Sequence, residues 1–472
     1  ALNLTGGSLT INYTPSWDST IIGAEFSAPV TLGGTANLSV NTLQVDAAQA
    51  FTVAGGSLTF NAINLMPGAT PARLVIGGDI TLSSLLSGDS TIAVGSGTGS
   101  LAYVDLNGAS HAWNVVSGSS ISVQTVVKNG GLSKIGSGAL SLEAPNQYAG
   151  GTVVSAGRLY VNNASGSGTG SGTVTVNGGT LGGTGAIAGS TVINSSGVLA
   201  PGAASIGSLA FSTPPTLNGT TFLRIDSDGG TASADQIIVS SGTLTFGGTL
   251  MVSNAGPALV GGEAFTNFIA PARSGAFESV SLPPLAAGLN WYLGDMTPFG
   301  RIKVNRSPSA GVLTFTNIPG GELQIPLASL LDGATDADGD ALALDSINLV
   351  STNGVALSTN ASFLLYSNSL NPADRISFTL TDGHGGTATG YVYIAASARG
   401  QFGAQPVVSS AAATVQFFGS PQGVYYLERS TNLTDWITIS TNTMPANGVR
   451  SYMDDFGDLA AVPAAAFYRL RW

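Results

Sequence analysis

Gly138-Ala-Leu-Ser-Leu, Gly157-Arg-Leu-Tyr-Val and Gly172-Thr-Val-Thr-Val are three successive segments that decide the fold of this chain. In each, a glycine precedes a short stretch in which apolar residues alternate with small or polar ones. The pattern returns at Gly242-Thr-Leu-Thr-Phe and Gly248-Thr-Leu-Met-Val. Alternation with a period of two indicates β-strands with one apolar face. Strands this short cannot bury that face alone, so we expect neighbours to stack and share a core.

The composition favours the same all-β architecture. The chain has 472 residues, of which 65 are glycine and only 9% are charged. Val, Ile, Thr and Leu abound, and Val, Ile and Thr favour β-strands. Solenoid coils take ~20–29 residues each, and the uneven spacing of Gly138, Gly157, Gly172 and Gly197 predicts loops of uneven length. The sequence therefore predicts a right-handed parallel β-helix, a solenoid, over residues 1–300.

Charge and cysteine content exclude several classes of function. The formal net charge is −11, and Lys128, Lys134 and Lys303 are the three lysines, so no basic stripe is available to neutralise nucleic-acid phosphates. There is no cysteine, which excludes disulfides, thiolate chemistry and Cys-based metal sites. No run of ~20 apolar residues predicts a membrane-spanning helix.

The first residues of the chain lead to an expectation about its export. It opens directly into strand-like sequence at Leu2-Asn-Leu-Thr, so we expect any export signal to have been removed already. A solenoid end without a cap is an exposed sheet edge, and such an edge can pair with another copy of the chain.

A family resemblance becomes specific within the solenoid. Gly131-Leu-Ser-Lys-Ile-Gly-Ser-Gly-Ala-Leu-Ser-Leu, followed by Asn146-Gln-Tyr-Ala-Gly-Gly-Thr-Val-Val-Ser-Ala-Gly-Arg-Leu, resembles the autotransporter-associated β-strand repeat. Gly197-Val-Leu-Ala-Pro-Gly also resembles this repeat. The resemblance covers residues 130–202 most clearly. It implies an exported bacterial protein, secreted or displayed at the cell surface, with a parallel β-helix and no enzyme activity.

Two further modules are expected after the solenoid. Clean alternation in Gly321-Glu-Leu-Gln-Ile-Pro-Leu and Ile376-Ser-Phe-Thr-Leu predicts a small antiparallel β-sandwich over 312–396. Its Asp-Gly-rich segment from Leu331 resembles bacterial cadherin-like repeats, which are Ig-like extracellular modules that often bind calcium. A second small antiparallel β-module is predicted over 399–472, and it resembles a C-terminal module of secreted Verrucomicrobia-type proteins.

The densest group of polar residues in the chain is acidic. Hard oxygen ligands at alternating positions suit Ca²⁺, so the sequence predicts a structural calcium site. An EF-hand loop beginning at Asp336 is excluded, because its sixth position is Ala341 and its twelfth is Ile347. A solvated acidic turn is the alternative, since Asp and Gly favour turns. The candidate ligands are Asp332, Asp336, Asp338, Asp340 and Asp382.

No constellation in the sequence predicts catalysis. Asp226, Asp228 and Asp235 form a small acidic group in the solenoid, but their Ser- and Gly-rich surroundings favour a surface turn over a glycosidase pair. His384 lies in a glycine-rich turn, and no nucleophile elbow is present. Several aromatic residues are candidates for stacking on sugars but show no regular spacing: Trp17, Trp113, Tyr148, Tyr160 and Trp291.

The sequence thus predicts a non-enzymatic structural protein of the bacterial surface or exterior. Self-association into filaments or a surface layer through the β-modules and the solenoid ends is the expected mode of assembly. An adhesin that contacts a polysaccharide or the cell envelope is the alternative. A polysaccharide-degrading β-helix enzyme is a second alternative.

Overall fold

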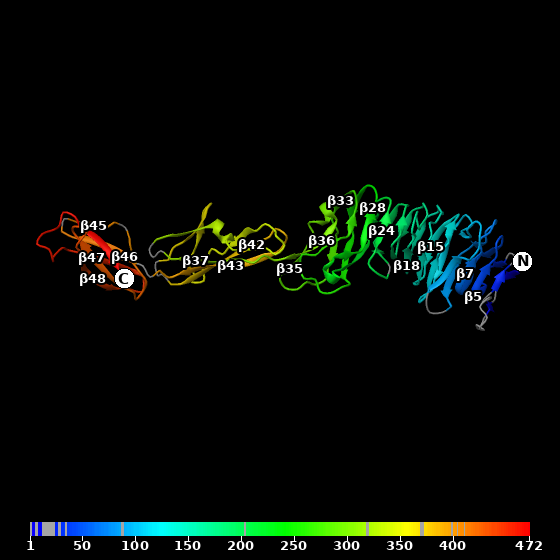
Figure 1. Cartoon of the computed structure of the whole chain (residues 1–472), viewed down its shortest axis with the longest axis horizontal. Coiled ribbons are helices and arrows are strands. Elements are labelled where there is room, and N and C mark those ends of the chain that lie inside the picture. Colours follow the sequence, from blue (N-terminus) through cyan, green and yellow to red (C-terminus); the bar gives the residue numbers. More distant parts are fainter. Residues whose placement is uncertain are drawn as a thin grey trace. The chain divides into compact units, whose positions relative to one another are not determined.

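The computed structural model describes residues 2–4, 8–11, 24–26, 30–33, 35–85, 89–202, 204–317, 321–368, 372–397, 400–403, 405–409 and 411–472. The chain divides into two compact units. Unit 1 comprises Ala1–Ala286 and Tyr292–Val304, and unit 2 comprises Ala287–Trp291 and Asn305–Trp472. Both are built almost wholly from β-strands, which Figure 1 colours from blue to green in unit 1 and from yellow-green to red in unit 2. Among the described residues, no helix is long and apolar enough to cross a membrane.

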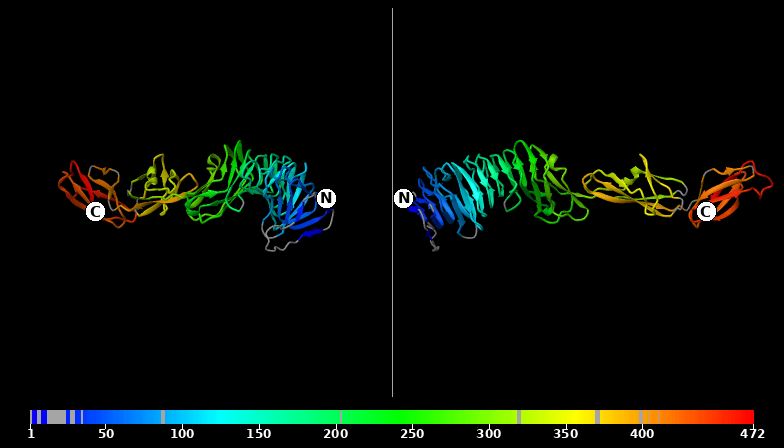
Figure 2. Two further views of the ribbon diagram at one scale, coloured as in Figure 1. Left: turned by 45° about the vertical axis from the view of Figure 1, so that its right-hand side comes forward. Right: turned by 180° about the vertical axis from the view of Figure 1, so that it is seen from behind.

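Unit 1 is a parallel β-solenoid whose successive turns stack strand on strand (Figure 2). Its largest sheet has 21 strands, which pair in parallel except where β27 runs antiparallel to β26. These strands are β2 (Ser8–Ile11), β3 (Ala24–Phe26), β5 (Asn37–Val45), β7 (Ser57–Leu65), β9 (Ile80–Ser84), β10 (Asp89–Val94), β12 (Ser110–Val115), β13 (Ser120–Val123), β15 (Gly131–Ile135), β16 (Ala139–Leu142), β17 (Thr152–Val154), β18 (Arg158–Val161), β19 (Val174–Val176), β20 (Gly179–Gly183), β22 (Thr191–Ile193), β23 (Gly197–Pro201), β25 (Thr216–Leu217), β26 (Thr220–Asp226), β27 (Ser233–Ala234), β30 (Thr249–Asn254) and β34 (Ser279–Ser281).

Smaller sheets complete unit 1. A six-stranded parallel sheet contains β1 (Leu2–Leu4), β4 (Val30–Leu32), β6 (Ala50–Val53), β8 (Arg73–Ile76), β11 (Tyr103–Asp105) and β14 (Val126–Lys128). A four-stranded sheet contains β21 (Ala186–Ile187), β24 (Ser208–Phe211), β28 (Gln236–Val239) and β32 (Phe268–Ile269), and β29 (Thr243–Phe246) pairs with β33 (Ala272–Gly275). The remaining elements of unit 1 are η1 (Asp228–Gly230), β31 (Ala264–Thr266) and α1 (Met296–Phe299), while β35 (Leu289–Tyr292) and β36 (Arg301–Arg306) contain residues of both units.

The glycine-led segments form the solenoid because their apolar residues stack in register. Leu140 pairs with Leu159, Leu159 with Leu181, and Leu181 with Leu199, and all four side chains are fully buried. The intervening residues face outward. At Gly157, where φ is 66°, a Cβ atom would collide with the carbonyl oxygens of Gly136 and Gly138. Glycine is therefore needed where one turn passes tightly over the next.

The parallel β-helix predicted from these segments is confirmed. The predicted exposed N-terminal end is not described fully, because residues 1, 5–7 and 12–23 lie outside the described part of the chain. In the described part, β1 pairs in parallel with β4, and β2 pairs in parallel with β5.

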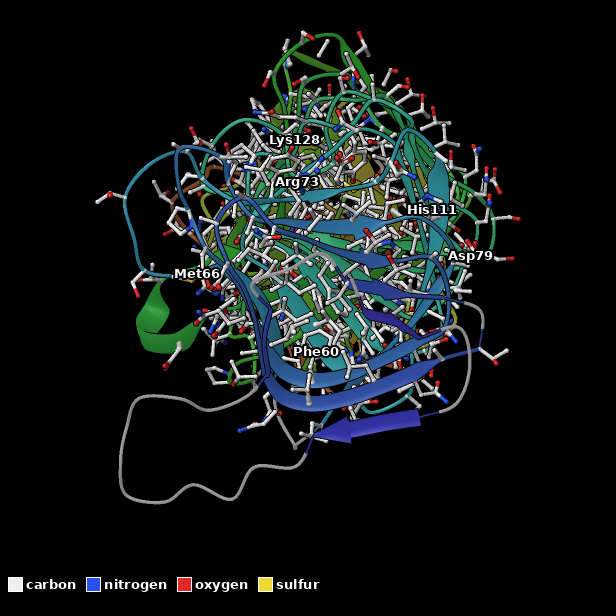
Figure 3. All side chains as sticks on the ribbon, turned by 90° about the vertical axis from the view of Figure 1, so that its right-hand side faces the viewer. Phe60, Met66, Arg73, Asp79, His111 and Lys128 are labelled. Carbon is white, nitrogen blue, oxygen red and sulfur yellow. The ribbon has the colours of Figure 1, made fainter. Side chains whose placement is uncertain are left out.

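The outer surface near this end carries isolated polar interactions. Figure 3 looks along the stacked turns from this end and labels Arg73 and Lys128 on one side and Asp79 and His111 on another. Arg73 is 3.7 Å from the carboxylate of Asp105, and Lys128 Nζ lies 4.5 Å from the centre of the Tyr103 ring. Such exposed pairs add little stability. Phe60, labelled in the same view, belongs to the buried core.

Lys134 of β15 is the unusual residue of the solenoid interior. Its side chain is fully buried, and Nζ donates hydrogen bonds to the carbonyl oxygens of Ile135 (2.8 Å), Gly136 (2.7 Å) and Ala156 (3.2 Å). It therefore links the glycine turns of two successive coils. Burial lowers the pKa of the Lys134 ammonium group to about 8, because the charged form is poorly solvated there.

Unit 2 contains two separate hydrophobic cores, each between two sheets. The first sandwich has the sheets β37 (Val312–Thr316), β43 (Thr387–Ala395), β42 (Asp374–Thr381) and β39 (Ala343–Ile347), and β38 (Leu323–Pro326), β41 (Phe363–Tyr366) and β40 (Ser358–Thr359), with η2 (Leu327–Leu331) between β38 and β39. The C-terminal module has the sheets β44 (Gln401–Phe402), β45 (Val407–Val408), β46 (Ala413–Phe418) and β49 (Val449–Asp454), and β48 (Ile437–Thr443), β47 (Val424–Ser430) and β50 (Phe467–Arg471).

Small antiparallel sheets after the solenoid are confirmed, and among the described strands β37 pairs in parallel with β43. In the first sandwich, Ile325 of β38 and Leu364 of β41 pack into one core with Ile376 of β42 and Val392 of β43. In the C-terminal module, Phe417 of one sheet packs with Leu427 of the other. The predicted boundaries at residues 300, 312, 396 and 399 stay predictions.

The buried amine of Lys134 gives a testable pH dependence. Between pH 8 and 10.5 the unfolded chain binds more protons at this residue than the folded chain. The free energy of unfolding of the wild type should therefore rise through this interval relative to Lys134→Met, by about 3 kcal/mol in total. Urea unfolding of both proteins from neutral to alkaline pH measures the difference. Parallel pH profiles for the two proteins would show that Lys134 titrates normally when folded.

Candidate metal centre

The acidic loop of the first sandwich lies between η2 and β39. Its geometry is set by Asp336, whose Oδ1 accepts hydrogen bonds from the backbone N–H groups of Asp338 (2.8 Å) and Asp340 (3.1 Å). Aspartate commonly closes turns in this way, by bonding backbone groups that follow it. The loop therefore curls around Asp336 and brings alternate carboxylates to the same side.

Three of the five predicted ligands meet there. Asp336, Asp338 and Asp340 each offer one carboxylate oxygen, and these oxygens all lie within 4.8 Å of one another. The three residues are partly buried, and the side chain of Asp338 is almost fully so, at 3% exposed. Carboxylate oxygens in this number are ligands that hard cations such as Ca²⁺ prefer. The aspartate triad could therefore hold a metal ion.

Two basic side chains adjoin the triad. Arg306 binds Asp338 twice, through its backbone N–H to Oδ2 (2.8 Å) and its Nη1 to Oδ1 (2.9 Å). His384 Nδ1 lies 3.0 Å from Asp340 Oδ2. The three carboxylates and the guanidinium together carry a net charge of −2, which a divalent cation would balance.

One carboxylate oxygen of Asp336 lacks a hydrogen-bond donor in the described part of the chain. Its Oδ2 is buried and has no hydrogen-bond partner among the described residues, while its Oδ1 is used by the loop backbone. A buried carboxylate oxygen without a donor is unfavourable. A cation in the triad would remove that penalty.

The other two predicted ligands have different surroundings. Asp382 is buried, and its carboxylate accepts hydrogen bonds from His384 N–H (2.7 Å), Gly386 N–H (2.9 Å) and Asn305 Nδ2 (2.7 Å). It shapes the turn that presents His384 to Asp340, so it adjoins the triad through a second residue. Asp332 is exposed at the end of η2 and lies outside the group of three.

Sequence reasoning missed Arg306 and the contact of His384. Arg306 lies 32 residues before Asp338 in the chain, and only the folded sandwich brings the two together. For His384, its place in Asp382-Gly-His-Gly-Gly gave a signal for a turn, but none for its contact with Asp340.

The residues considered for sugar binding and catalysis occupy several environments. Trp113 and Tyr148 are fully buried, which removes them from any surface site, whereas Tyr160 and Trp291 are half-buried. Trp17 lies outside the described residues. Asp235 is buried and bound by Arg224, with 2.8 Å between Nε and Oδ2. Asp226 Oδ1 accepts the backbone N–H of Asp228 (2.9 Å), as in a surface turn.

Comparison with known families agrees with this architecture. Residues 132–161 match the family described as passenger-associated-transport-repeat, and residues 305–395 match the family described as bacterial Ig domain. A search of curated proteins gave no significant match. The first match falls in the stacked strands β15 to β18 and the second covers the sandwich with the aspartate triad. The repeat implies a bacterial secreted or surface protein. The chain therefore carries an autotransporter-associated repeat within a long parallel sheet, followed by a bacterial Ig-like domain.

Proposed function

We propose that this protein is a non-enzymatic structural component of the bacterial surface, with the solenoid as scaffold and the C-terminal module as the element of self-association. The observation that carries the scaffold role is the continuous stack of parallel strands in unit 1. Its interior is filled by registered apolar residues, and its ladder is made of backbone hydrogen bonds. A structure built in this way resists local opening, because each coil is held by both neighbours.

The use of acidic side chains in the solenoid supports a non-enzymatic role. Asp235 is bound by Arg224, and Asp79 Oδ1 accepts the backbone N–H of Ala112 at 2.7 Å. Glu143 Oε1 accepts the hydroxyl of Ser122 at 2.7 Å. Each of these carboxylates supports local structure, whereas a glycosidase needs two facing a common substrate space.

The surface of the C-terminal module supports self-association. In the edge strand β45, Val407 and Val408 are 73% and 72% exposed, and β45 pairs only with β46 among the described strands. Nearby, a hollow of about 450 Å³ is lined in part by Leu433, Trp436 and Phe467. Exposed apolar patches and free strand edges favour association. Two copies that pair their β45 edges antiparallel would form a symmetric dimer in which both valine pairs are covered.

Electron microscopy and a glycan-degradation assay test the proposal as a whole. The purified chain should form regular dimers or larger assemblies and should release neither reducing ends nor unsaturated sugars from a panel of polysaccharides. Isolated particles at every concentration would overturn the assembly role. Reproducible sugar release would overturn the non-enzymatic role.

The self-association surface yields a sharper prediction. Val407→Asp combined with Val408→Asp places charge on the β45 edge and should dissociate the assembly, measured by sedimentation velocity on the full chain. Val312→Asp is the matched control, since Val312 is 80% exposed on a different module. If the control dissociates the assembly as strongly, or the double variant leaves it intact, β45 is not the interface.

We also propose that the aspartate triad binds Ca²⁺ and stabilises the Ig-like domain. Calcium at about 100 times its Kd should stabilise the domain by about 2.7 kcal/mol, and so raise its melting temperature relative to chelator. Asp336→Asn should abolish this rise, because Asp336 carries the buried oxygen without a donor. Asp332→Asn, outside the triad, should preserve it. Equal melting temperatures in calcium and in chelator would contradict calcium binding and would favour a solvated acidic turn.

A further inference from the structure

The outward face of the solenoid contains a hollow with an unusual lining. Its volume is about 290 Å³, and it lies over strands β18, β20, β23 and β26. Its lining includes Arg158, Tyr160, Ala200, Phe222 and Arg224, and no acidic residue. The whole chain has 26 Asp and Glu against 15 Lys and Arg, so a surface hollow with two arginines and no carboxylate departs from the average.

The register of the strands creates this hollow. Tyr160 pairs with Gly182, and Gly182 pairs with Ala200. Leu199 pairs with Thr221, so the residues that follow them, Ala200 and Phe222, lie side by side on the outward face. Two aromatic side chains thus stand about three strand spacings apart, ~14 Å. Gly182 is buried, and a Cβ there would lie 3.4 Å from Cδ1 of Tyr160, whereas Ala200 carries only a methyl group and lines the hollow. The open space therefore adjoins Ala200.

The two arginines at the hollow have different roles. Arg224 is anchored: its Nε and Nη2 bind the carboxylate of buried Asp235 at 2.8 and 3.0 Å, and Nη2 also donates to the carbonyl oxygen of Pro201 at 3.1 Å. Asp235 balances its charge. Arg158 is exposed and forms no ion pair with any carboxylate in the described part of the chain.

Among the described arginines, Arg158 belongs to a minority without a carboxylate partner, together with Arg273, Arg375 and Arg450. Most of the described ones are bound to carboxylates, namely Arg73, Arg224, Arg301, Arg306, Arg429, Arg469 and Arg471. A guanidinium without a carboxylate partner, on the same strand as Tyr160, can bind a carboxylate through two parallel hydrogen bonds.

We propose that this hollow binds an acidic polysaccharide, with Arg158 binding a uronate carboxylate and Tyr160 and Phe222 packing against the apolar faces of sugar rings. Aromatic side chains offer broad apolar faces that suit the C–H faces of pyranose rings. Ala200, whose side chain is a single methyl group, forms part of the floor between Tyr160 and Phe222. This role is distinct from self-association, since the hollow lies in unit 1 and β45 lies in unit 2.

Isothermal titration of the full chain tests the proposal. The probes are oligogalacturonate, oligoalginate and oligohyaluronate, with a neutral cello-oligosaccharide of matched length for comparison. At least one uronate oligomer should bind saturably, and the neutral oligomer should bind at least about tenfold more weakly, since the charge-assisted contact is worth at least ~1.4 kcal/mol. Absence of binding to all three acidic probes overturns the proposal.

Three variants assign binding to the hollow. Arg158→Gln should weaken uronate binding about tenfold or more and should remove the preference over the neutral oligomer. Tyr160→Ala should weaken both acidic and neutral binding, and Ala200→Leu should block the floor without changing charge. Arg375→Gln is the matched control, because Arg375 lies 4.6 Å from the Tyr391 ring on the Ig-like domain and repeats the arginine–tyrosine pairing elsewhere.

The variants also define the outcomes that contradict the assignment. Binding that survives all three hollow variants, or that falls equally in Arg375→Gln, places the ligand elsewhere and overturns the proposal. Circular dichroism of each variant separates these outcomes from misfolding. Assembly measured in the same samples should be unchanged, so a failure of the proposed scaffold role would remain distinguishable from a failure of sugar binding.

Discussion

The registered stacking of one coil on the next is the interaction on which the solenoid depends. A coil of this chain has too few apolar residues to bury its own inner face, and its strands leave backbone groups unpaired on both edges. The stack Leu140, Leu159, Leu181 and Leu199 solves both problems together, because the same register that buries the leucines aligns the backbone ladder. A slip of one residue would turn every leucine outward.

This constraint also decides how polar groups enter the interior. Asn146 is buried, accepts the backbone N–H of Val127 at 2.8 Å and donates to the carbonyl oxygen of Gly168 at 2.5 Å. Lys134 likewise spans carbonyl oxygens of neighbouring turns. Both side chains bond the turns, where the ladder leaves backbone groups without strand partners, and so they extend the stacking to parts of each coil that cannot form strands. The autotransporter-associated repeat thus combines apolar stacking with polar bracing of the glycine turns.

Much of the fold could be predicted from sequence, because it follows from local pattern. Alternation after Gly138, Gly157 and Gly172 specifies strands, and the lack of a self-sufficient core specifies stacking. The aspartate triad was also accessible, since Asp336, Asp338 and Asp340 come together through a turn that Asp336 itself closes. Arg306 and His384 were not accessible, because their contacts depend on how distant strands of the sandwich pack.

The hollow on the solenoid was hidden for a related reason. Its aromatic walls, Tyr160 and Phe222, belong to coils of unequal length, so no regular spacing in the sequence connects them. Only the strand register places Gly182 and Ala200 between them. A surface site on this solenoid is therefore formed by residues of several paired coils, and the sequence of a single coil does not reveal it.

Charge balance connects the triad with the rest of the Ig-like domain. Without Arg306, three carboxylates would face one another with no guanidinium beside them. Arg306 holds Asp338 in place and lowers the charge of the group to −2, which makes a divalent ion sufficient. Asp382 is bound by three protein donors and fixes His384 against Asp340 without adding an oxygen to the group. Protein contacts thus hold the loop in place before any ion binds. Asp336 Oδ2 still lacks a hydrogen-bond donor among the described residues, and a bound cation would stabilise the loop by contacting that oxygen.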